Sequence, residues 1–134
     1  MSPGGAAGGG EGKAIRGVVV AHGGVAAALV AAAEEISGIH GALVPISNSG
    51  LDRDSLERTL LAAVEHQPAV IFVDLPSGSC LFAAMRQRPE QPELRIVTGV
   101  NLVMLLEFLF HREQTPDEVA RRAADSGARG IGAR

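Results

Sequence analysis

Two polar residues of this chain stand where side-chain chemistry is expected. His22 ends the apolar run at residues 18–21 and precedes a pair of glycines. Asp74 ends a second apolar run, at residues 69–73. Short β-branched runs of this kind indicate buried strands of a parallel sheet. Ligands of open α/β sheets bind at the carboxyl ends of the strands, so the two residues predict a reactive site at one sheet edge.

This arrangement suits transfer of a phosphoryl group through a histidine. If Asp74 lies beside His22, its carboxylate accepts a hydrogen bond from one ring nitrogen and leaves the other free as a nucleophile. Backbone N–H groups at helix starts, and the hydroxyls of the loop after Asp74, would then hold the phosphoryl oxygens. The catalytic candidates are His22 and Asp74, and the phosphate-binding candidates are Gly23, Ser77, Gly78 and Ser79.

Simpler structural roles are open for the same residues. Asp74 alone could cap the next helix, and Ser79 is also suited to be a helix N-cap. Ser77 fits ordinary turn chemistry. The remaining histidines follow no predicted strand and carry no expected role; they are His40, His66 and His111.

Composition excludes several classes of function. The chain has 134 residues and a formal net charge of −3, with a pI near 5.8, so no basic surface points to nucleic acid or to an anionic membrane. It has no Trp or Tyr and four Phe, too few aromatic rings for a base-stacking platform. No nucleotide-binding glycine motif follows a predicted strand. The phosphoryl donor should therefore be a protein, and no cofactor is expected.

Cysteine usage limits the metal and redox chemistry. Cys80 is the only cysteine, which excludes an internal disulfide and a cysteine-based zinc cluster and fits a reducing compartment. Its simplest role is that of a small buried thiol. No pair of ligands has the sequence spacing of a metal site, so no metal is expected.

The pattern of elements predicts an α/β fold, doubly wound, with a mainly parallel central sheet and helices on both faces. Residues 1–14 are expected to form a disordered Gly-rich tail, and residues 15–134 a single domain. Residues 102–110 are apolar but too short to span a bilayer, and no signal peptide is visible, so we expect a cytoplasmic protein. Strands are expected at residues 16–21, 42–46, 69–73 and 94–98, and helices at 25–37, 54–67, 79–87, 101–111 and 115–127. Residues 130–131 could add a short final strand.

Local signals fix several element ends. Gly38 should cap the first helix at its C-terminus, and Pro45 should place the second strand at an edge. Asp54 is expected at the start of the second helix, while Asn101 and Thr115 are expected N-caps. The last helix should stop at a glycine, Gly127.

Three segments together resemble the mannose-family IIA component of the bacterial phosphoenolpyruvate-dependent sugar phosphotransferase system. They are residues 18–23 with His22, residues 73–79 with Asp74 and a Gly-Ser pair, and residues 98–107 with the sequence Gly-Val-Asn-Leu. They keep the family's order and spacing, and the resemblance covers about residues 15–132. It implies a homodimer in which His22 accepts a phosphoryl group from phospho-HPr and passes it to a IIB component during sugar uptake. It further implies that Asp74 is the partner of the histidine and Ser79 a phosphate contact.

The chain departs from the family pattern in the loop that would face the partner. The family has Gly, Pro and Asn where this chain has Ser77, Cys80 and Phe82, and Pro where it has Val103. A membrane would be involved only indirectly, through separate IIC and IID components. Three alternatives stay open: a regulator read out by phosphorylation, the phosphotransfer subunit of a dihydroxyacetone kinase, and a binding module without phosphorylation.

Overall fold

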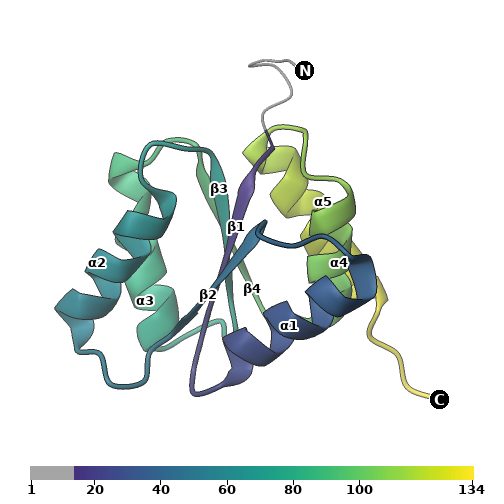
Figure 1. The fold of residues 1–134 in the computed structure, drawn as a ribbon, viewed down its shortest axis with the longest axis horizontal. Coiled ribbons are helices and arrows are strands. Elements are labelled where there is room, and N and C mark those ends of the chain that lie inside the picture. The colour runs from purple at the N-terminus through teal and green to yellow at the C-terminus, as the bar shows by residue number, and fades with distance from the viewer. Residues whose placement is uncertain (1–13) are drawn as a thin grey trace.

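Strands and helices alternate along the chain and build one parallel sheet between two layers of helices (Figure 1). The computed structural model describes residues 14–134, so the tail expected over residues 1–14 lies outside the described residues except for Ala14. The strands are β1 (Arg16–Ala21), β2 (Leu43–Ser47), β3 (Ala69–Val73) and β4 (Leu94–Thr98). They lie in the order β2-β1-β3-β4, and every neighbouring pair is parallel.

The helices divide between the two faces of the sheet. One face is covered by α1 (Val25–Ser37), α4 (Leu102–Phe110) and α5 (Pro116–Arg129). The other is covered by α2 (Arg53–Val64) and α3 (Ser79–Met85), and a short 3-10 turn, η1 (Arg88–Glu90), follows α3. Between residues 14 and 134, no helix is both long and apolar enough to cross a bilayer.

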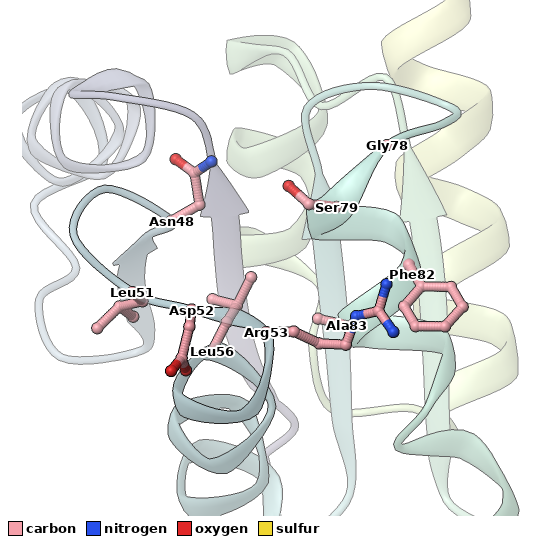
Figure 2. Close-up of a pocket in the computed structure, with 9 residues that line it drawn as sticks. All are labelled: Asn48, Leu51, Asp52, Arg53, Leu56, Gly78, Ser79, Phe82 and Ala83. Atoms are coloured by element: carbon pink, nitrogen blue, oxygen red, sulfur yellow. The ribbon is translucent and has the colours of Figure 1, made fainter.

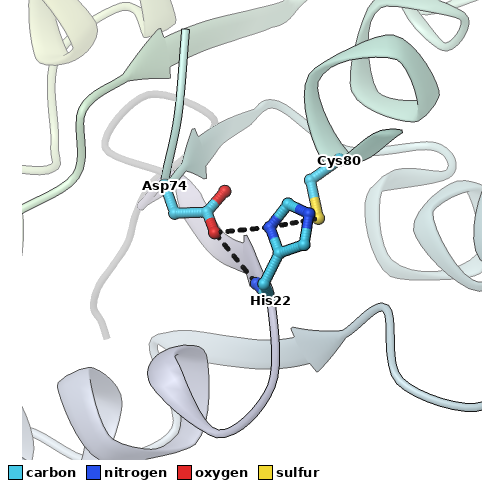
Figure 3. A group of neighbouring side chains, drawn as sticks. All are labelled: His22, Asp74 and Cys80. Carbon is cyan, nitrogen blue, oxygen red and sulfur yellow. Dashed lines mark hydrogen bonds and ion pairs between the residues drawn. The ribbon is translucent and has the colours of Figure 1, made fainter. Parts of the chain in front are cut away.

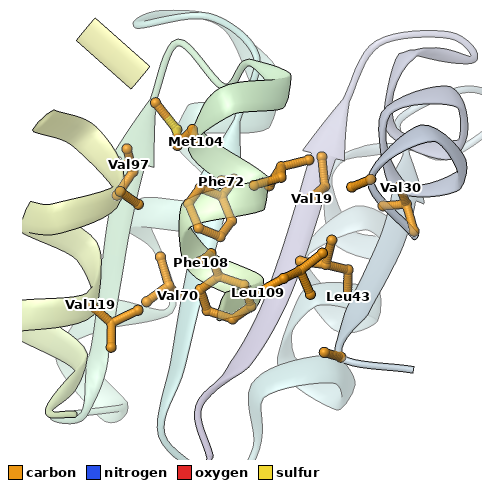
Figure 4. Packing of buried hydrophobic residues seen from close by; sticks show 14 of the residues in the cluster. Val19, Val30, Leu43, Val70, Phe72, Val97, Met104, Phe108, Leu109 and Val119 are labelled. Atoms are coloured by element: carbon orange, nitrogen blue, oxygen red, sulfur yellow. The ribbon is translucent and has the colours of Figure 1, made fainter. Parts of the chain in front are cut away.

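Strand alternation sends successive side chains of β1 and β3 into two different cores. Val19 and Phe72 face α1, α4 and α5, whereas Val18 and Ile71 face α2 and α3. In the first core, the rings of Phe72 and Phe108 meet edge to face with centroids 5.3 Å apart (Figure 4). Each large apolar side chain buried in this way stabilises the fold by roughly 1.5–3 kcal/mol. These cores fix the ends of β1 and β3 relative to each other.

Most of the expected elements are confirmed. The doubly wound α/β architecture is present, and β1, β3, β4 and α1 have the predicted bounds. Gly38 caps α1 in the left-handed conformation, with φ of 75°. Pro45 is exposed on the edge strand β2. Asn101 and Thr115 cap α4 and α5 by accepting hydrogen bonds from Met104 N–H and Glu118 N–H.

Four local expectations were wrong. Helix α2 is capped by Asp52, which accepts from Ser55 N–H, so Asp54 lies inside the first turn. Gly78, rather than Ser79, occupies the N-cap position of α3. Helix α5 continues past Gly127 to Arg129. Gly127 is a packing position, since a Cβ there would lie 2.8 Å from the Met104 side chain. Residues 130–131 form no strand.

Candidate functional site

The strand order brings the two predicted reactive residues together. The chain leaves β1 toward β2 on one side, and β3 pairs with the other side of β1, so the winding direction reverses between β1 and β3. Val20 of β1 lies opposite Val73 of β3, and His22 and Asp74 follow these strands directly. A reversal of this kind opens a crevice at the carboxyl edge, where ligands of doubly wound sheets bind.

His22 and Asp74 form a direct pair (Figure 3). The ring Nδ1 of His22 lies 2.8 Å from Oδ2 of Asp74, and the His22 backbone N–H donates to the same oxygen at 2.9 Å. The Leu75 N–H donates to the other carboxylate oxygen at 2.9 Å. The His22 ring makes its polar contacts through Nδ1, and among residues 14–134 its Nε2 has no hydrogen-bond partner. The His22 side chain is 43% exposed and that of Asp74 is 14% exposed, so the ring reaches solvent while the carboxylate is held behind it.

The environment favours the ionised form of Asp74. Burial alone would raise the pKa of this carboxyl, but hydrogen bonds from the His22 ring, the His22 backbone and Leu75 outweigh burial and hold the pKa below its usual value. An ionised carboxylate accepts a hydrogen bond from a protonated Nδ1, and this tautomer leaves the lone pair of Nε2 facing outward. The pair therefore has the geometry of a nucleophilic imidazole oriented by a carboxylate.

The loop after β2 holds the Gly23 turn in place. Gly23 has φ of 60°, a left-handed conformation that favours glycine. Its carbonyl accepts a hydrogen bond from Ser47 Oγ at 2.8 Å, and its N–H donates to Asn48 Oδ1 at 3.4 Å. The Gly23 N–H is therefore engaged by Asn48, and it would have to exchange this long hydrogen bond to contact a phosphoryl oxygen. Sequence reasoning missed Ser47 and Asn48, because only the β1–β2 pairing brings them to this turn.

The other phosphate-binding candidates lie in the loop between Asp74 and α3. Ser77, Gly78 and Ser79 are exposed there, and Ser79 is the first residue of α3. Gly78 has φ of 97° and ψ of −173°, a region open essentially to glycine alone. This conformation sets the direction in which α3 leaves the loop. The helix start thereby carries Ser79 and Cys80 to the same sheet edge as His22.

Cys80 lies against the reactive pair, next to the predicted site. Its side chain is fully buried, as expected, and its Sγ lies 3.8 Å from His22 Nδ1. Burial raises the pKa of the thiol, and the negative charge of Asp74 raises it further, although a hydrogen bond with Ser79 acts against this. An imidazole nitrogen of His22, a carboxylate oxygen of Asp74 and the Sγ atom of Cys80 all lie within 4.8 Å of one another, and each of these atoms can bind a metal ion. The spacing argument against a metal site missed this group, since its members come from three separate elements.

A cavity of about 460 Å³ opens between the β2–α2 loop and α3 (Figure 2). Gly78 and Ser79 line one side, and the guanidinium of Arg53 lies 4.7 Å from the centre of the Phe82 ring. Its complete lining is Asn48, Leu51, Asp52, Arg53, Leu56, Gly78, Ser79, Phe82 and Ala83. Phe82, one of the positions that depart from the family pattern, therefore lines this cavity.

The other three histidines lack this setting. Their ring nitrogens lie 3.5, 3.2 and 3.1 Å from carboxylate oxygens of residues close to them in sequence. The pairs are His40 with Glu34, His66 with Glu65, and His111 with Glu107. Among residues 14–134, His22 is the histidine that a carboxylate from a distant strand orients.

Comparison with known proteins gives one family match. The model of the family described as "PTS system fructose IIA component" matches residues 17–123. The matched range contains all of the candidate site residues and most of the described chain. No curated protein sequence matches.

Solved structures share the fold at low sequence identity. Phosphotransferase system component EIIA from Streptococcus agalactiae superposes with a TM-score of 0.83 at 22% identity, covering 89% of this chain and 96% of that one. The mannose/sorbose-specific IIA subunit from Enterococcus faecalis has a TM-score of 0.81 at 23% identity, covering 91% and 96%. A sigma-54 interaction domain protein from Enterococcus faecalis has a TM-score of 0.75 at 14% identity, covering 89% and 94%. At these identities the likeness concerns the fold alone, so function has to be argued from the site.

Proposed function

This chain belongs to the family of PTS system fructose IIA components, and from that premise we propose that His22 carries a phosphoryl group. In this proposal phospho-HPr is the donor and a separate IIB component is the acceptor, in the cytoplasm. The observation that carries the proposal is the 2.8 Å contact between His22 Nδ1 and Asp74 Oδ2 at the carboxyl edge of the sheet. It leaves Nε2 free to act as the nucleophile.

In the first step, the lone pair of Nε2 attacks the phosphorus of the donor phosphohistidine. The bond from Nε2 to phosphorus forms, and the donor's phosphorus–nitrogen bond breaks with its electron pair returning to the donor ring. Positive charge develops on the His22 ring as Nε2 becomes bonded. The ionised Asp74 stabilises this charge through the proton on Nδ1, with no need to take the proton itself.

The second step runs the same chemistry toward the acceptor. A nucleophilic nitrogen of the IIB component attacks phosphorus, and the Nε2 electron pair returns to the His22 ring. Because the transition state spreads charge over the equatorial oxygens, nearby donors lower its energy. We assign this role to the Ser79 hydroxyl and to backbone N–H groups at Gly23, Ser77 and Gly78.

Phosphorylation with purified components tests the proposal. The chain is incubated with phosphoenolpyruvate, enzyme I and HPr, and the product should carry one acid-labile, base-stable phosphate on His22. His22→Ala should abolish labelling. The variants His40→Ala, His66→Ala and His111→Ala are matched controls, and each should be labelled like the parent. Phosphate mapped by mass spectrometry to any of those three histidines, or its absence from the parent chain, would refute the assignment.

A further inference from the structure

Three side chains at the sheet edge have a combination of donor atoms that phosphoryl transfer does not use. We propose that His22, Asp74 and Cys80 bind a single Zn²⁺ ion, and that the bound ion switches off the His22 nucleophile. The imidazole nitrogen, the carboxylate oxygen and the thiol sulfur all lie within 4.8 Å of one another. They come from the ends of β1 and β3 and from the first turn of α3.

The distances are close to those of a tetrahedral zinc site. Zinc binds nitrogen and oxygen at about 2.0–2.2 Å and sulfur at about 2.3 Å, which puts the nitrogen roughly 3.4 Å from the oxygen and 3.6 Å from the sulfur. His22 Nδ1 now lies 2.8 Å from Asp74 Oδ2 and 3.8 Å from Cys80 Sγ. Admission of the ion therefore requires the ring and the carboxylate to separate by about 0.6 Å. The carboxylate oxygen and the sulfur, which lie within 4.8 Å of each other, must also come to about 3.6 Å.

The surroundings support such a site. The Asp74 carboxylate is already oriented by the His22 and Leu75 N–H groups, contacts of the kind that position metal ligands. Cys80 is fully buried in the core, whereas the His22 side chain is 43% exposed and leaves an open side for entry and for a water ligand. A mixed set of nitrogen, oxygen and sulfur donors selects zinc over magnesium or calcium, which bind oxygen ligands.

Zinc binding would remove the nucleophile without moving the backbone. The ion forms bonds to Nδ1, to an Asp74 oxygen and to Sγ. The thiol proton leaves to water, the Nδ1 proton is also lost to water, and Nε2 takes up one proton from water, so the imidazole stays neutral with its proton moved to Nε2. That proton occupies the lone pair which attacks phosphorus in the proposed function. The switch therefore rests on the proposed function, whereas binding of the ion does not.

Metal titration of the chelator-treated full chain tests the binding. We expect one Zn²⁺ per chain in competition with a chromophoric chelator, and a thiolate-to-metal absorption band when Co²⁺ is the probe. Cys80→Ala should abolish the band and weaken zinc affinity at least about tenfold, as loss of even a supporting group does at metal sites. Cys80→Ser keeps the size of the side chain and gives the same test if the alanine variant fails to fold.

His40→Ala is the matched control. His40 lies 3.5 Å from the Glu34 carboxylate at the surface, so this pair is a place where zinc could bind non-specifically. The variant should retain both the zinc affinity and the cobalt band. Equal zinc affinity in the parent and Cys80→Ala, or loss of the ion in His40→Ala, would overturn the zinc site.

A second measurement separates the switch from the proposed function. Isolated phospho-HPr is mixed with metal-free chain, with and without Zn²⁺. Zinc should slow the labelling of the parent strongly. The factor by which zinc slows the labelling of Cys80→Ala should be at least about tenfold smaller, because this variant binds zinc more weakly. If zinc binds but labelling is unaffected, the switch is wrong. If the metal-free chain is never labelled, the proposed function fails and the switch with it, while the titration still decides the zinc site.

Discussion

The contact between His22 and Asp74 assigns different tasks to two side chains of one site. Asp74 is the less exposed of the two and accepts three hydrogen bonds, two from His22 and one from Leu75. It is thus placed to fix the ring and to stabilise charge, while His22 forms the bond. Removing the charge of Asp74 should slow the chemistry more than it disturbs the fold.

Asp74→Asn keeps the shape of the side chain and removes its charge. The rate of labelling by phospho-HPr should fall by about tenfold to several thousandfold, or about 1.4–5 kcal/mol of barrier, because the charge on the ring loses its partner. Single-turnover kinetics measures this rate. Ser79→Ala should cost less, since backbone N–H groups still hold the phosphoryl oxygens. An undiminished rate in Asp74→Asn would show that His22 works without this carboxylate.

The lowered pKa of Asp74 leads to a second prediction, which concerns how the free energy of unfolding depends on pH. The pKa of Asp74 is lower in the folded chain than in the unfolded chain, so the carboxylate stabilises the fold fully above its unfolded pKa and loses this contribution as the pH falls through its folded pKa. The difference in free energy of unfolding between the parent and Asp74→Asn should be constant above about pH 5 and shrink on acidification below it. Urea unfolding at several pH values measures it.

A double substitution shows whether His22 causes this effect. In a His22→Ala background the ring no longer donates to Asp74, while the two backbone N–H groups still do. The pH-dependent part of the Asp74→Asn difference should therefore become smaller. A difference that grows as the solution is acidified would contradict the sign of the shift.

At the residue scale, the sequence placed His22 and Asp74 at strand ends because an apolar run and its terminating polar residue are both local patterns. The proximity of Cys80 to His22 is not local. Their atoms lie 3.8 Å apart across 58 positions of sequence, and this closeness depends on the loop conformation before α3. No spacing pattern contains that information.

At the scale of elements, the loop before α3 determines where the first residues of α3, Ser79 and Cys80, lie relative to His22. Gly78→Ala forces a Cβ into backbone angles that are essentially restricted to glycine, although nothing lies within 4 Å of the added atom. We expect the free energy of unfolding to fall by about 1–3 kcal/mol from backbone strain alone. Labelling of His22 should slow as well, because Ser79 moves with the helix start.

Gly132→Ala is the control for this strain. It also adds a Cβ in open space, but its φ lies outside the left-handed region, so stability should change by less than about 0.5 kcal/mol. Denaturant unfolding compares the two variants. Equal stability of Gly78→Ala and the parent would show that the loop relaxes and does not set the direction of α3.

The sequence predicted which helices and strands are present more accurately than it predicted where they begin and end. Asp52 and Asp54 are both residue types suited to an N-cap. Asp52 is the cap of α2, and which of the two takes this place depends on the path of the β2–α2 loop. Gly127 is a residue type that often ends a helix, but it lies inside α5, where Met104 and Asn101 approach its backbone closely. Close approach between two helices is a tertiary constraint that a single helix sequence does not display.

At the scale of the whole molecule, the alternating pattern predicted the doubly wound fold but not the strand order. The site exists because β3 pairs with β1 and β2 takes the other side. A sheet in which β2 lay between β1 and β3 would have the same local sequence signals and would separate His22 from Asp74. The strand order is set by packing of both helical layers, which involves residues far apart in the chain.

The last prediction concerns assembly, because the surface of the molecule keeps apolar side chains that its own cores do not cover. Val103 is 43% exposed and Phe110 is 55% exposed, and at a spacing of seven residues they share one face of α4. We predict a homodimer at micromolar concentration that uses this face, with a mass by light scattering of twice 13.8 kDa.

A charge on this face should separate the subunits, since it would be desolvated at the interface. Val103→Glu should shift the mass toward the monomer. Met85→Glu is the matched control, because Met85 is 49% exposed on α3, in the opposite helical layer, and its substitution should leave the dimer intact. A monomer mass for the parent throughout the micromolar range would rule out the dimer. An unchanged dimer in Val103→Glu would instead move the interface to another face, leaving the exposed residues of α4 free for a different partner.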